Sequence, residues 1–282
     1  MNVLSLFDGM SCGRIALERV GVRVDKYYAS EVDKHAISVS QYNYPDIKQI
    51  GCVKNVKQNT LPYINLLLAG SPCQGFSNMG AGLNFDDPKS KLFFEFIRIK
   101  KETNPDFFLL ENVRMKKEWV KIISDMVGVE PLFINSKSFC AQSRPRIYWT
   151  NIPISPIPSS LYSLKDILQT EEDDSLLLDA KWTNRINTSS DIPKKFSRVD
   201  PDIAGCLTAR MYANWKGNYI STSKGLRRLS PIECERLQTV PDNYTKSVGS
   251  SHRYKMLGNG WTVDVVAHIL KGLKNKPMWE EI

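Results

Sequence analysis

Residues 2–13 read Asn-Val-Leu-Ser-Leu-Phe-Asp-Gly-Met-Ser-Cys-Gly. The apolar run from Asn2 to Phe7 predicts a buried strand, and the stretch from Cys12 to Val20 predicts a helix. The turn between them contains Gly9 and reaches Gly13, so its backbone can approach a ligand closely and present free N–H groups to it. The spacing is not Gly-x-Gly-x-x-Gly, which disfavours a dinucleotide site. Strand, turn and helix together predict the first unit of an α/β fold.

The same alternation of strands and helices continues through the first half of the chain. Short apolar runs predict strands at Tyr27–Ser30, Ile64–Ala69 and Phe107–Leu110, and Phe93–Lys100 predicts a helix. This order is typical of a Rossmann-like, doubly wound and mostly parallel sheet. Sheets of this kind bind ligands where the carboxyl ends of the strands meet polar or glycine-rich turns.

The composition and the hydrophobic pattern of the sequence change near Asn151. Residues 152–158 contain three prolines, an acidic run follows at 171–174, and irregular sequence continues to about residue 224. A helix is expected from Ser230, because Ser230 and Glu233 have the spacing of a capping box. The apolar stretch Thr262–Leu270 predicts a closing helix. We therefore expect a main domain of residues 1–150 and 226–282, with a small irregular domain of residues 151–225.

Composition limits the class of protein. The 282 residues are 42% hydrophobic and 24% charged, as in an ordinary globular protein, and no apolar run approaches the roughly 20 residues of a membrane span. The N-terminus lacks the features of a signal peptide, so we expect a cytoplasmic protein. The six cysteines are scattered, which predicts reduced thiols and no metal site. A net charge of +8 suits a polyanionic partner, but many basic proteins never bind nucleic acid.

Cys73 is the first candidate for a reactive group. It follows the apolar run Leu66–Gly70 within Ser71-Pro72-Cys73-Gln74, so it is expected just beyond the end of a strand. Glycines at 75, 80 and 82 predict a loop that can close over a substrate. A lone cysteine is more often a small buried hydrophobe than a nucleophile, so the case for Cys73 depends on its neighbours.

Charged residues supply those neighbours. Glu111 follows the strand Phe107–Leu110 directly, where partial burial can raise a carboxyl pKa for acid catalysis; the alternative is a helix cap. Arg144 and Arg146 alternate in an extended segment, so they should point the same way and grip a base carbonyl or a phosphate. The alternative is a surface ion pair.

With these motifs in this order, the chain resembles the cytosine-C5 DNA methyltransferases over nearly its whole length. The motifs are Phe7-Asp8-Gly9 with Gly13, Glu31, Ser71-Pro72-Cys73-Gln74, Glu111-Asn112-Val113, Gln142-x-Arg144-x-Arg146, and Gly258-Asn259-Gly260-Trp261-Thr262-Val263. It looks closest to the animal de novo type, through Leu6–Gly9, Ala29–Val32, Leu92–Phe96 and Trp261. Because it begins almost at the first motif, we expect a short stand-alone member of prokaryotic or phage type, without regulatory domains.

The resemblance implies a class I fold dependent on S-adenosylmethionine, with residues 1–150 and 226–282 as the catalytic domain and 151–225 as the target-recognition region. It implies that the Cys73 thiolate adds to C6 of a flipped-out cytosine and that S-adenosylhomocysteine is the product. Glu111 would bind N3 and the exocyclic amine, and Arg146 with Arg144 would stabilise the O2 side. A free thiol has a pKa of about 8.5, so the loop must favour the thiolate.

The resemblance also assigns the residues that contact the methyl donor. They are Phe7, Asp8, Gly9, Met10, Ser11, Glu31, Val32, Cys52, Val53, Pro72, Asn259, Gly260 and Trp261. Glu31 would hold the ribose. Most of the family has Gly-Asp where this chain has Gly51-Cys52, and a thiol is a poorer acceptor for the adenine amine. A second departure is Asn65, where an Asp is common and to which no function is attached.

The resemblance implies two partners, double-stranded DNA and a cognate restriction endonuclease. No association with a membrane is expected. The residues expected to contact DNA are Gln74, Ser77, Arg185, Arg198 and Arg210. The recognition region is short for the family, which indicates either a short target sequence or a second subunit in a homodimer. In a prokaryote the protein would lie at the nucleoid.

Two other readings stay open. An RNA methyltransferase of the same fold acts on transfer RNA, but usually has Pro-Pro-Cys-Gln-Pro where this chain has Ser71-Pro72-Cys73-Gln74-Gly75. A catalytically silent stimulatory subunit is opposed by the retention of Cys73, Glu111 and both arginines. Methyltransferases that act on adenine N6 or cytosine N4 are disfavoured, because their Pro-Pro-Tyr/Phe site is absent.

Overall fold

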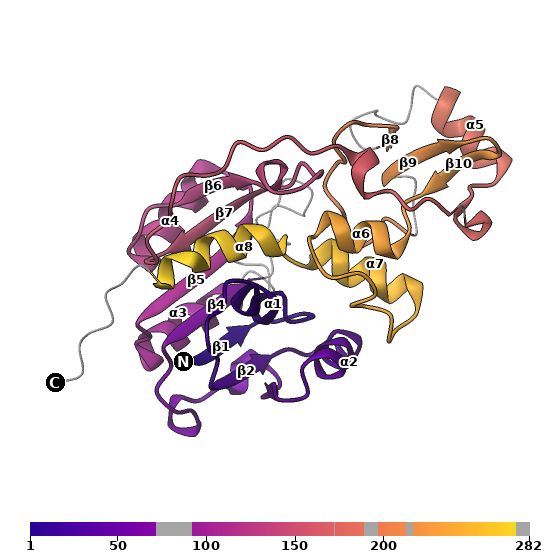
Figure 1. Cartoon of the computed structure of the whole chain (residues 1–282). Coiled ribbons are helices and arrows are strands. Elements are labelled where there is room, and N and C mark those ends of the chain that lie inside the picture. The colour runs from indigo at the N-terminus through magenta and orange to yellow at the C-terminus, as the bar shows by residue number, and fades with distance from the viewer. Residues whose placement is uncertain (72–91, 172, 189–196, 213–216, 275–282) are drawn as a thin grey trace. The chain divides into compact units, whose positions relative to one another are not determined.

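The structure is a computed structural model of the whole chain (Figure 1), and it describes residues 1–71, 92–171, 173–188, 197–212 and 217–274. The chain forms two compact units. The first contains residues 1–134, 145–156 and 265–282, and the second contains residues 135–144 and 157–264. Each unit is described by itself.

A seven-stranded sheet organises the first unit. In spatial order its strands are β3 (Lys48–Gln49), β2 (Lys26–Ser30), β1 (Asn2–Leu6), β4 (Leu66–Gly70), β5 (Phe107–Val113), β7 (Pro145–Thr150) and β6 (Leu132–Asn135). The first five strands are mutually parallel, and β7 runs antiparallel to β5. The predicted Rossmann-like, mostly parallel sheet is confirmed.

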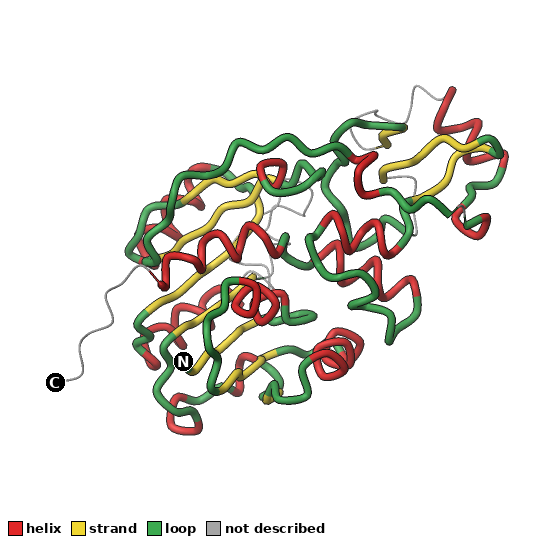
Figure 2. Tube along the Cα trace, viewed as in Figure 1, coloured by secondary structure: helices red, strands yellow, loops and turns green. Residues whose placement is uncertain are grey.

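Helices alternate with these strands (Figure 2). In chain order they are α1 (Cys12–Arg19), α2 (Lys34–Asn43), α3 (Leu92–Thr103), α4 (Lys117–Val127) and α8 (Val263–Leu270). On one face of the sheet α3 and α4 bury Phe93, Phe96 and Ile123 against strand residues such as Leu67 and Trp149. Every residue from Leu66 to Ala69 is fully buried, as the uninterrupted apolar run requires of a central parallel strand.

The register of the strands brings the sequence motifs to one edge of this sheet. Leu6, the last residue of β1, lies opposite Ser30 of β2 and Ala69 of β4, and Gly70 lies opposite Glu111 of β5. The turns that follow these strand ends therefore begin at the same level. This is the carboxyl edge, where doubly wound sheets bind their ligands.

In its described residues the second unit has a small sheet and three α-helices. Its strands are β8 (Ser197–Val199), β9 (Gly217–Thr222) and β10 (Gly225–Arg228), in the order β10-β9-β8, and its helices are α5 (Ala180–Thr188), α6 (Pro231–Leu237) and α7 (Ser250–Asn259). The predicted capping box at α6 is confirmed, since Ser230 accepts from the backbone of Glu233 and the Glu233 side chain accepts in return. Residues 226–264 cluster with this unit, so it is larger than the recognition region expected at 151–225.

Asn65 has a structural role at the opposite edge of the first sheet. Its Oδ1 accepts from the backbone N–H of Asn2 at 2.8 Å, and its Nδ2 donates to Asp106 Oδ2 at 3.0 Å. Tyr63 donates to the other oxygen of Asp106 at 2.7 Å. An Asp at position 65 could not donate to Asp106, so this partner explains why the chain has the amide.

We expect Asn65→Asp to lower the free energy of unfolding by about 1 kcal/mol, because a hydrogen bond is replaced by two facing carboxylates. Urea unfolding of both proteins at pH 7.5 measures this loss. The double variant Asn65→Asp/Asp106→Asn reverses the donor and the acceptor and should recover most of it. A double variant no more stable than Asn65→Asp would contradict the assignment.

Candidate active site

The turn after β1 has the shape of a ligand-binding loop. Phe7, Gly9 and Ser11 have φ angles of +57°, +60° and +65°, so three residues of this turn are left-handed. A Cβ on Gly9 would meet no atom within 4 Å, so open space adjoins the backbone there. Glu31 fixes the turn, since its Oε2 accepts from the Gly9 N–H at 2.7 Å.

Asp8 begins a chain of polar side chains beneath this turn. It accepts from Ser11 at 2.5 Å and from the Tyr27 hydroxyl at 2.7 Å, and Ser11 lies 2.6 Å from Ser40. Burial raises the pKa of the Asp8 carboxyl to about 6, although these hydrogen bonds oppose the shift. Asp8 is therefore mostly an anion at pH 7.5.

The remaining cofactor candidates of the first unit are Met10, Val32, Cys52 and Val53, and Val32 directly follows Glu31. Glu31 Oε1 accepts from the N–H groups of Val32 and Asp33 at 2.7 and 2.8 Å, and the Val32 side chain is 71% exposed. Cys52 is half-buried and precedes a 3₁₀ turn that begins at the buried Val53. Met10 is buried and packs in the core.

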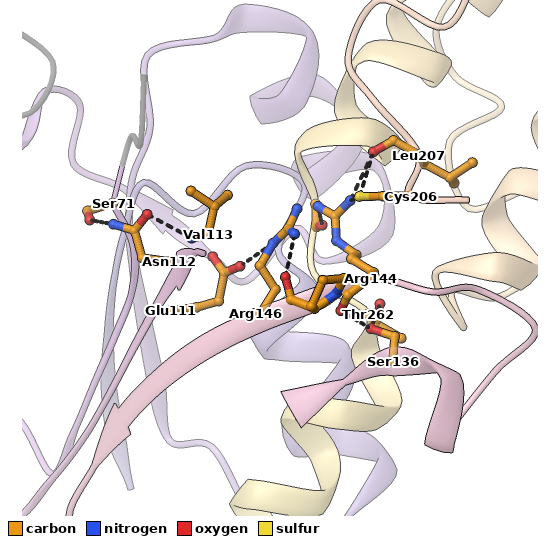
Figure 3. Close-up of polar contacts among 12 residues, drawn as sticks. Ser71, Glu111, Asn112, Val113, Ser136, Arg144, Arg146, Cys206, Leu207 and Thr262 are labelled. Atoms are coloured by element: carbon orange, nitrogen blue, oxygen red, sulfur yellow. Dashed lines mark hydrogen bonds and ion pairs between the residues drawn. The ribbon is translucent and has the colours of Figure 1, made fainter. Parts of the chain in front are cut away.

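Glu111 and Arg146 form an ion pair at the end of β5 (Figure 3). Arg146 Nε lies 2.9 Å from Glu111 Oε1, and the two side chains are only 13% and 11% exposed. Arg146 comes from β7, the antiparallel neighbour of β5, and lies opposite Val113. Arg146 also donates to the carbonyl of Pro145 at 2.9 Å. The two motifs meet at the carboxyl edge of the first sheet, and the catalytic roles expected of both side chains stay predictions.

Asn112 ties this site to the segment that leads to Cys73. Its Nδ2 donates to Ser71 Oγ at 2.9 Å, and its Oδ1 accepts from the Val113 N–H at 2.8 Å (Figure 3). Both Asn112 and Ser71 are buried. Sequence reasoning quoted Asn112 within a motif but gave it no role. The candidates Pro72, Cys73, Gln74 and Ser77 lie outside the described residues.

The candidates of the second unit have other environments. Arg144 is 3% exposed, and its guanidinium donates to backbone carbonyls of Leu207, Gly258 and Gly260. Asn259 ends α7 with an exposed side chain, and Trp261 is half-buried. Arg144 also contacts the Cys206 thiol, and none of its described partners is a carboxylate, so its contact with the target base stays a prediction.

The three described DNA-binding candidates also belong to the second unit. Arg185 lies on α5, with its guanidinium carbon 5.4 Å from the centre of the Trp182 ring. Arg198 lies on β8, and Arg210 is exposed in the loop after it. Nothing in these contacts tests DNA binding, so the three roles stay predictions.

Two other thiols are poor nucleophiles. Burial raises the pKa of Cys140 to about 12, and it raises the pKa of the fully buried Cys234 further. Thiolates at these positions would be scarce at neutral pH. Within the described ranges no cluster of His, Cys, Asp or Glu could hold a metal ion. Likewise, none of the helices described is long and apolar enough to cross a membrane.

The family model for C-5 cytosine-specific DNA methylases matches residues 1–275. The chain belongs to this family. Its enzyme class is therefore DNA (cytosine-5-)-methyltransferase, as the sequence motifs predicted. Type II methyltransferases are similar to it: M.NgoBI of Neisseria gonorrhoeae is 31% identical and aligns over 94% of this chain and 90% of its own length. M.HaeII of Haemophilus aegyptius is 30% identical, over 97% of this chain and 93% of its own.

Solved structures share the fold of this methyltransferase. The Entamoeba histolytica methyltransferase EhMeth has a TM-score of 0.79 at 16% identity, with 98% of both chains covered. The Dnmt2 methyltransferase of S. pombe has a TM-score of 0.76 at 18% identity and covers 98% of this chain and 99% of its own. At these identities the likeness concerns the fold alone.

The residues at the carboxyl edge fit S-adenosylmethionine, the methyl donor of the family. The donor carries a positive sulfonium and a positive ammonium, and the first turn offers the carboxylates of Asp8 and Glu31. Open space beside Gly9 admits a ligand to the backbone, and the exposed Val32 offers an apolar surface to a purine. The acidic and apolar groups thus match the two ends of the donor.

Proposed function

We propose that this methyltransferase methylates C5 of a flipped-out cytosine in a specific sequence of duplex DNA, through a covalent bond between Cys73 and C6. The observation that carries the proposal is the Glu111–Arg146 pair, held at 2.9 Å at the carboxyl edge of the sheet. Ser71, two residues before Cys73, is hydrogen-bonded to the neighbour of Glu111. Ser71, the last described residue before the segment that contains Cys73, is thereby held at the strand end that presents the carboxyl group.

The chemistry begins with the ring of cytosine. Its C5 is a poor nucleophile, so the Cys73 thiolate adds to C6 and moves electron density to C5. Glu111, in its protonated form, accepts a hydrogen bond from the exocyclic amine and gives its proton to N3, which offsets the charge that develops there. The carboxylate that results stays paired with Arg146. Arg146 keeps the carboxyl group in place and faces the O2 side.

The reaction ends with elimination. When bound, the donor would supply an electrophilic methyl group on its sulfonium and would leave as S-adenosylhomocysteine. C5 takes the methyl group as N3 returns its proton to Glu111. A base, proposed to be water, then removes the C5 proton, the C5–C6 double bond forms again and Cys73 leaves as a thiolate. A stacked base cannot reach these groups, so the cytosine must leave the helix first.

Each unit has its own proposed contacts. In the first unit the turn at residues 7–11 and the pair Glu31–Val32 contact the donor, and Cys52 and Val53 contact its adenine. In the second unit Asn259, Gly260 and Trp261 contact the donor, and Arg185, Arg198 and Arg210 contact DNA. Charge-assisted contacts to phosphates position the duplex, and base-edge contacts select the sequence.

The wider setting is proposed from the relatives. Several are named type II methyltransferases, which supports a cognate restriction endonuclease as a partner. A homodimer is proposed from the short recognition region of the sequence. A cytoplasmic, nucleoid-associated location is proposed from the DNA substrate.

Labelled methyl transfer tests the proposal directly. Purified protein with labelled donor is offered duplex DNA, single-stranded DNA and transfer RNA, and bisulfite sequencing of DNA from an expressing host identifies the target. We expect transfer to duplex DNA at one short sequence. Transfer to transfer RNA alone would establish the RNA enzyme instead, and transfer to none would favour the silent subunit.

Glu111→Gln should lower kcat about 100-fold, because an amide can hydrogen-bond the base but cannot supply a proton to N3. Single-turnover transfer to the DNA target measures the change, while the dissociation constant for S-adenosylhomocysteine should stay constant. Glu102→Gln is the matched control: it also neutralises a glutamate paired with an arginine, Arg98 at 2.8 Å, on the surface of α3. Equal losses in the two variants would contradict a catalytic role for Glu111.

Cys52→Asp should tighten the methyl donor about 5- to 10-fold, because a carboxylate is a better acceptor for the adenine amine than a thiol. Calorimetry gives the dissociation constant. Position 52 is also the N-cap of the 3₁₀ turn at Val53–Asn55 and makes no side-chain cap bond. Cys52→Ser adds a capping oxygen without a charge and is the control. An unchanged constant for Cys52→Asp would count against adenine binding at this position.

A further inference from the structure

Two buried polar side chains of the second unit, Arg144 and Gln238, converge on one turn of its backbone, and a third, Gln142, donates to Gln238. The side chains of Gln142, Arg144 and Gln238 are 0%, 3% and 0% exposed. The turn comprises residues 257–260, at the end of α7. We call these three side chains the turn clamp. Burial of so much polarity is costly unless each group is hydrogen-bonded, so their partners show what they hold.

Arg144 holds the turn from one side. Its Nη2 donates to the carbonyls of Gly258 at 3.0 Å and Gly260 at 2.8 Å, and its Nη1 donates to Leu207 at 3.0 Å. Nη1 also contacts Cys206 Sγ at 3.2 Å (Figure 3). A guanidinium holds its N–H donors in a rigid, planar arrangement. Because one nitrogen of Arg144 binds two carbonyls of the turn, the peptide groups of those carbonyls have little freedom to rotate.

Gln238 holds the same turn from α6. Its Nε2 donates to the carbonyls of Leu257 at 2.6 Å and Gly260 at 3.0 Å. Its Oε1 accepts from Gln142 Nε2 at 3.1 Å and from Thr262 Oγ1 at 2.9 Å. Gly260 is therefore bound by two members of the clamp, and Thr262 extends the network beyond the turn.

Backbone packing completes the restraint. A Cβ on Gly258 would lie 2.2 Å from the carbonyl carbon of Thr208, so only glycine allows the two backbones to approach this closely. The carbonyls of the turn face the clamp, whereas the side chain of Asn259 is exposed. The clamp thus fixes the backbone and leaves the exposed residue for another contact.

We propose that Arg144 and Gln238 are positioning residues, which hold Asn259, Gly260 and Trp261 in the conformation that binds the methyl donor. The proposal rests on the proposed function, which gives those three residues their contact with the donor. A turn that is already ordered costs less conformational entropy on binding, so the clamp contributes affinity without touching the ligand. In this proposal Arg144 acts through the turn, whereas Arg146 pairs with Glu111.

Calorimetry with S-adenosylhomocysteine tests this inference on the full chain. Gln238→Met removes two donors to the turn at nearly constant volume, and Arg144→Met removes the fork. We expect each to weaken the dissociation constant about 10-fold, by loss of preorganisation. For Gln238→Met we also expect kcat at saturating donor to stay within about 3-fold of the wild type, with KM for the donor raised, because uniform binding energy is lost.

Thr245→Val is the matched control. Thr245 is fully buried in the same unit, accepts from Arg253 Nε at 2.8 Å and donates to Glu235. These partners lie outside the turn at residues 257–260. It should lower the melting temperature comparably and leave the dissociation constant within about 2-fold. Equal weakening by Thr245→Val would show that lost stability, and not the turn, controls affinity.

The outcomes separate the inference from the proposed function. A wild-type protein that does not bind S-adenosylhomocysteine would overturn the proposed function. A wild type that binds, with unchanged constants in both variants, would overturn the inference alone, as would a large loss of kcat in Arg144→Met at an unchanged constant. If the methionine variants fail to fold, Arg144→Lys, which keeps the charge but loses the fork, is expected to weaken binding in the same direction.

Discussion

The Cys73→Ser variant should form no covalent complex with DNA that contains 5-fluorocytosine, and its methyl transfer should fall at least about 10³-fold. A serine hydroxyl is far less acidic than a thiol and cannot supply an anion to add to C6 near neutral pH. Fluorine at C5 cannot leave as a proton does, so in the wild type the reaction stops with Cys73 still bonded to the base. Denaturing electrophoresis of labelled DNA with the protein measures that complex.

Two further variants make the result specific. Cys12→Ser and Cys140→Ser change buried thiols of the described chain, and both should still form the complex. A complex that persists in Cys73→Ser but disappears in Cys140→Ser would assign the nucleophile to a thiol whose pKa is raised to about 12, and would contradict the proposed mechanism. Binding of S-adenosylhomocysteine by Cys73→Ser shows that the fold is intact.

The central strands could be predicted because a strand that is buried on both faces consists of a continuous run of apolar residues. The run expected at Ile64–Ala69 is the strand Leu66–Gly70, and the run at Phe107–Leu110 is extended to Val113. Strand β3 has only two residues, Lys48 and Gln49, and neither is apolar, so hydrophobic periodicity gave no signal for it. The small sheet of the second unit was missed for the same reason: its strands are short and interrupted by polar residues.

The sequence predicted the position of candidate residues that lie at strand ends. It did not predict the partners of residues that are held by contacts far along the chain. Glu111 lies near the end of β5 and Glu31 follows β2, so their position at the carboxyl edge followed from the topology. The alternate spacing of Arg144 and Arg146 predicted a shared direction, but the partners of Arg144 are carbonyls from residues 207, 258 and 260. No local pattern shows which distant carbonyls lack a donor. The Ser71–Asn112 bond was hidden likewise, because it joins residues 41 positions apart.

The Glu233→Gln variant should lose about 3–5 kcal/mol of unfolding free energy, because it leaves a buried arginine without its counter-charge. Glu233 is fully buried and pairs with Arg227, 8% exposed, through two bonds of 2.8 Å. Its oxygens also accept from the N–H groups of Ser230 at 2.8 Å and Gln169 at 2.9 Å. The capping box predicted only the bond to Ser230. The same carboxylate also joins the start of α6 to Arg227 of β10 and to the backbone of Gln169.

Urea unfolding of the full chain, followed by circular dichroism, measures the loss, and an exposed ion pair of the same unit provides the scale. Lys224 and Asp174 are 2.6 Å apart but 54% and 61% exposed, so Asp174→Asn should cost less than about 1 kcal/mol. Replacing both buried charges, in Arg227→Met/Glu233→Leu, should be less damaging than Glu233→Gln alone, because no unpaired charge remains. Similar losses for Glu233→Gln and Asp174→Asn would mean that water reaches Arg227, and that burial does not govern this pair.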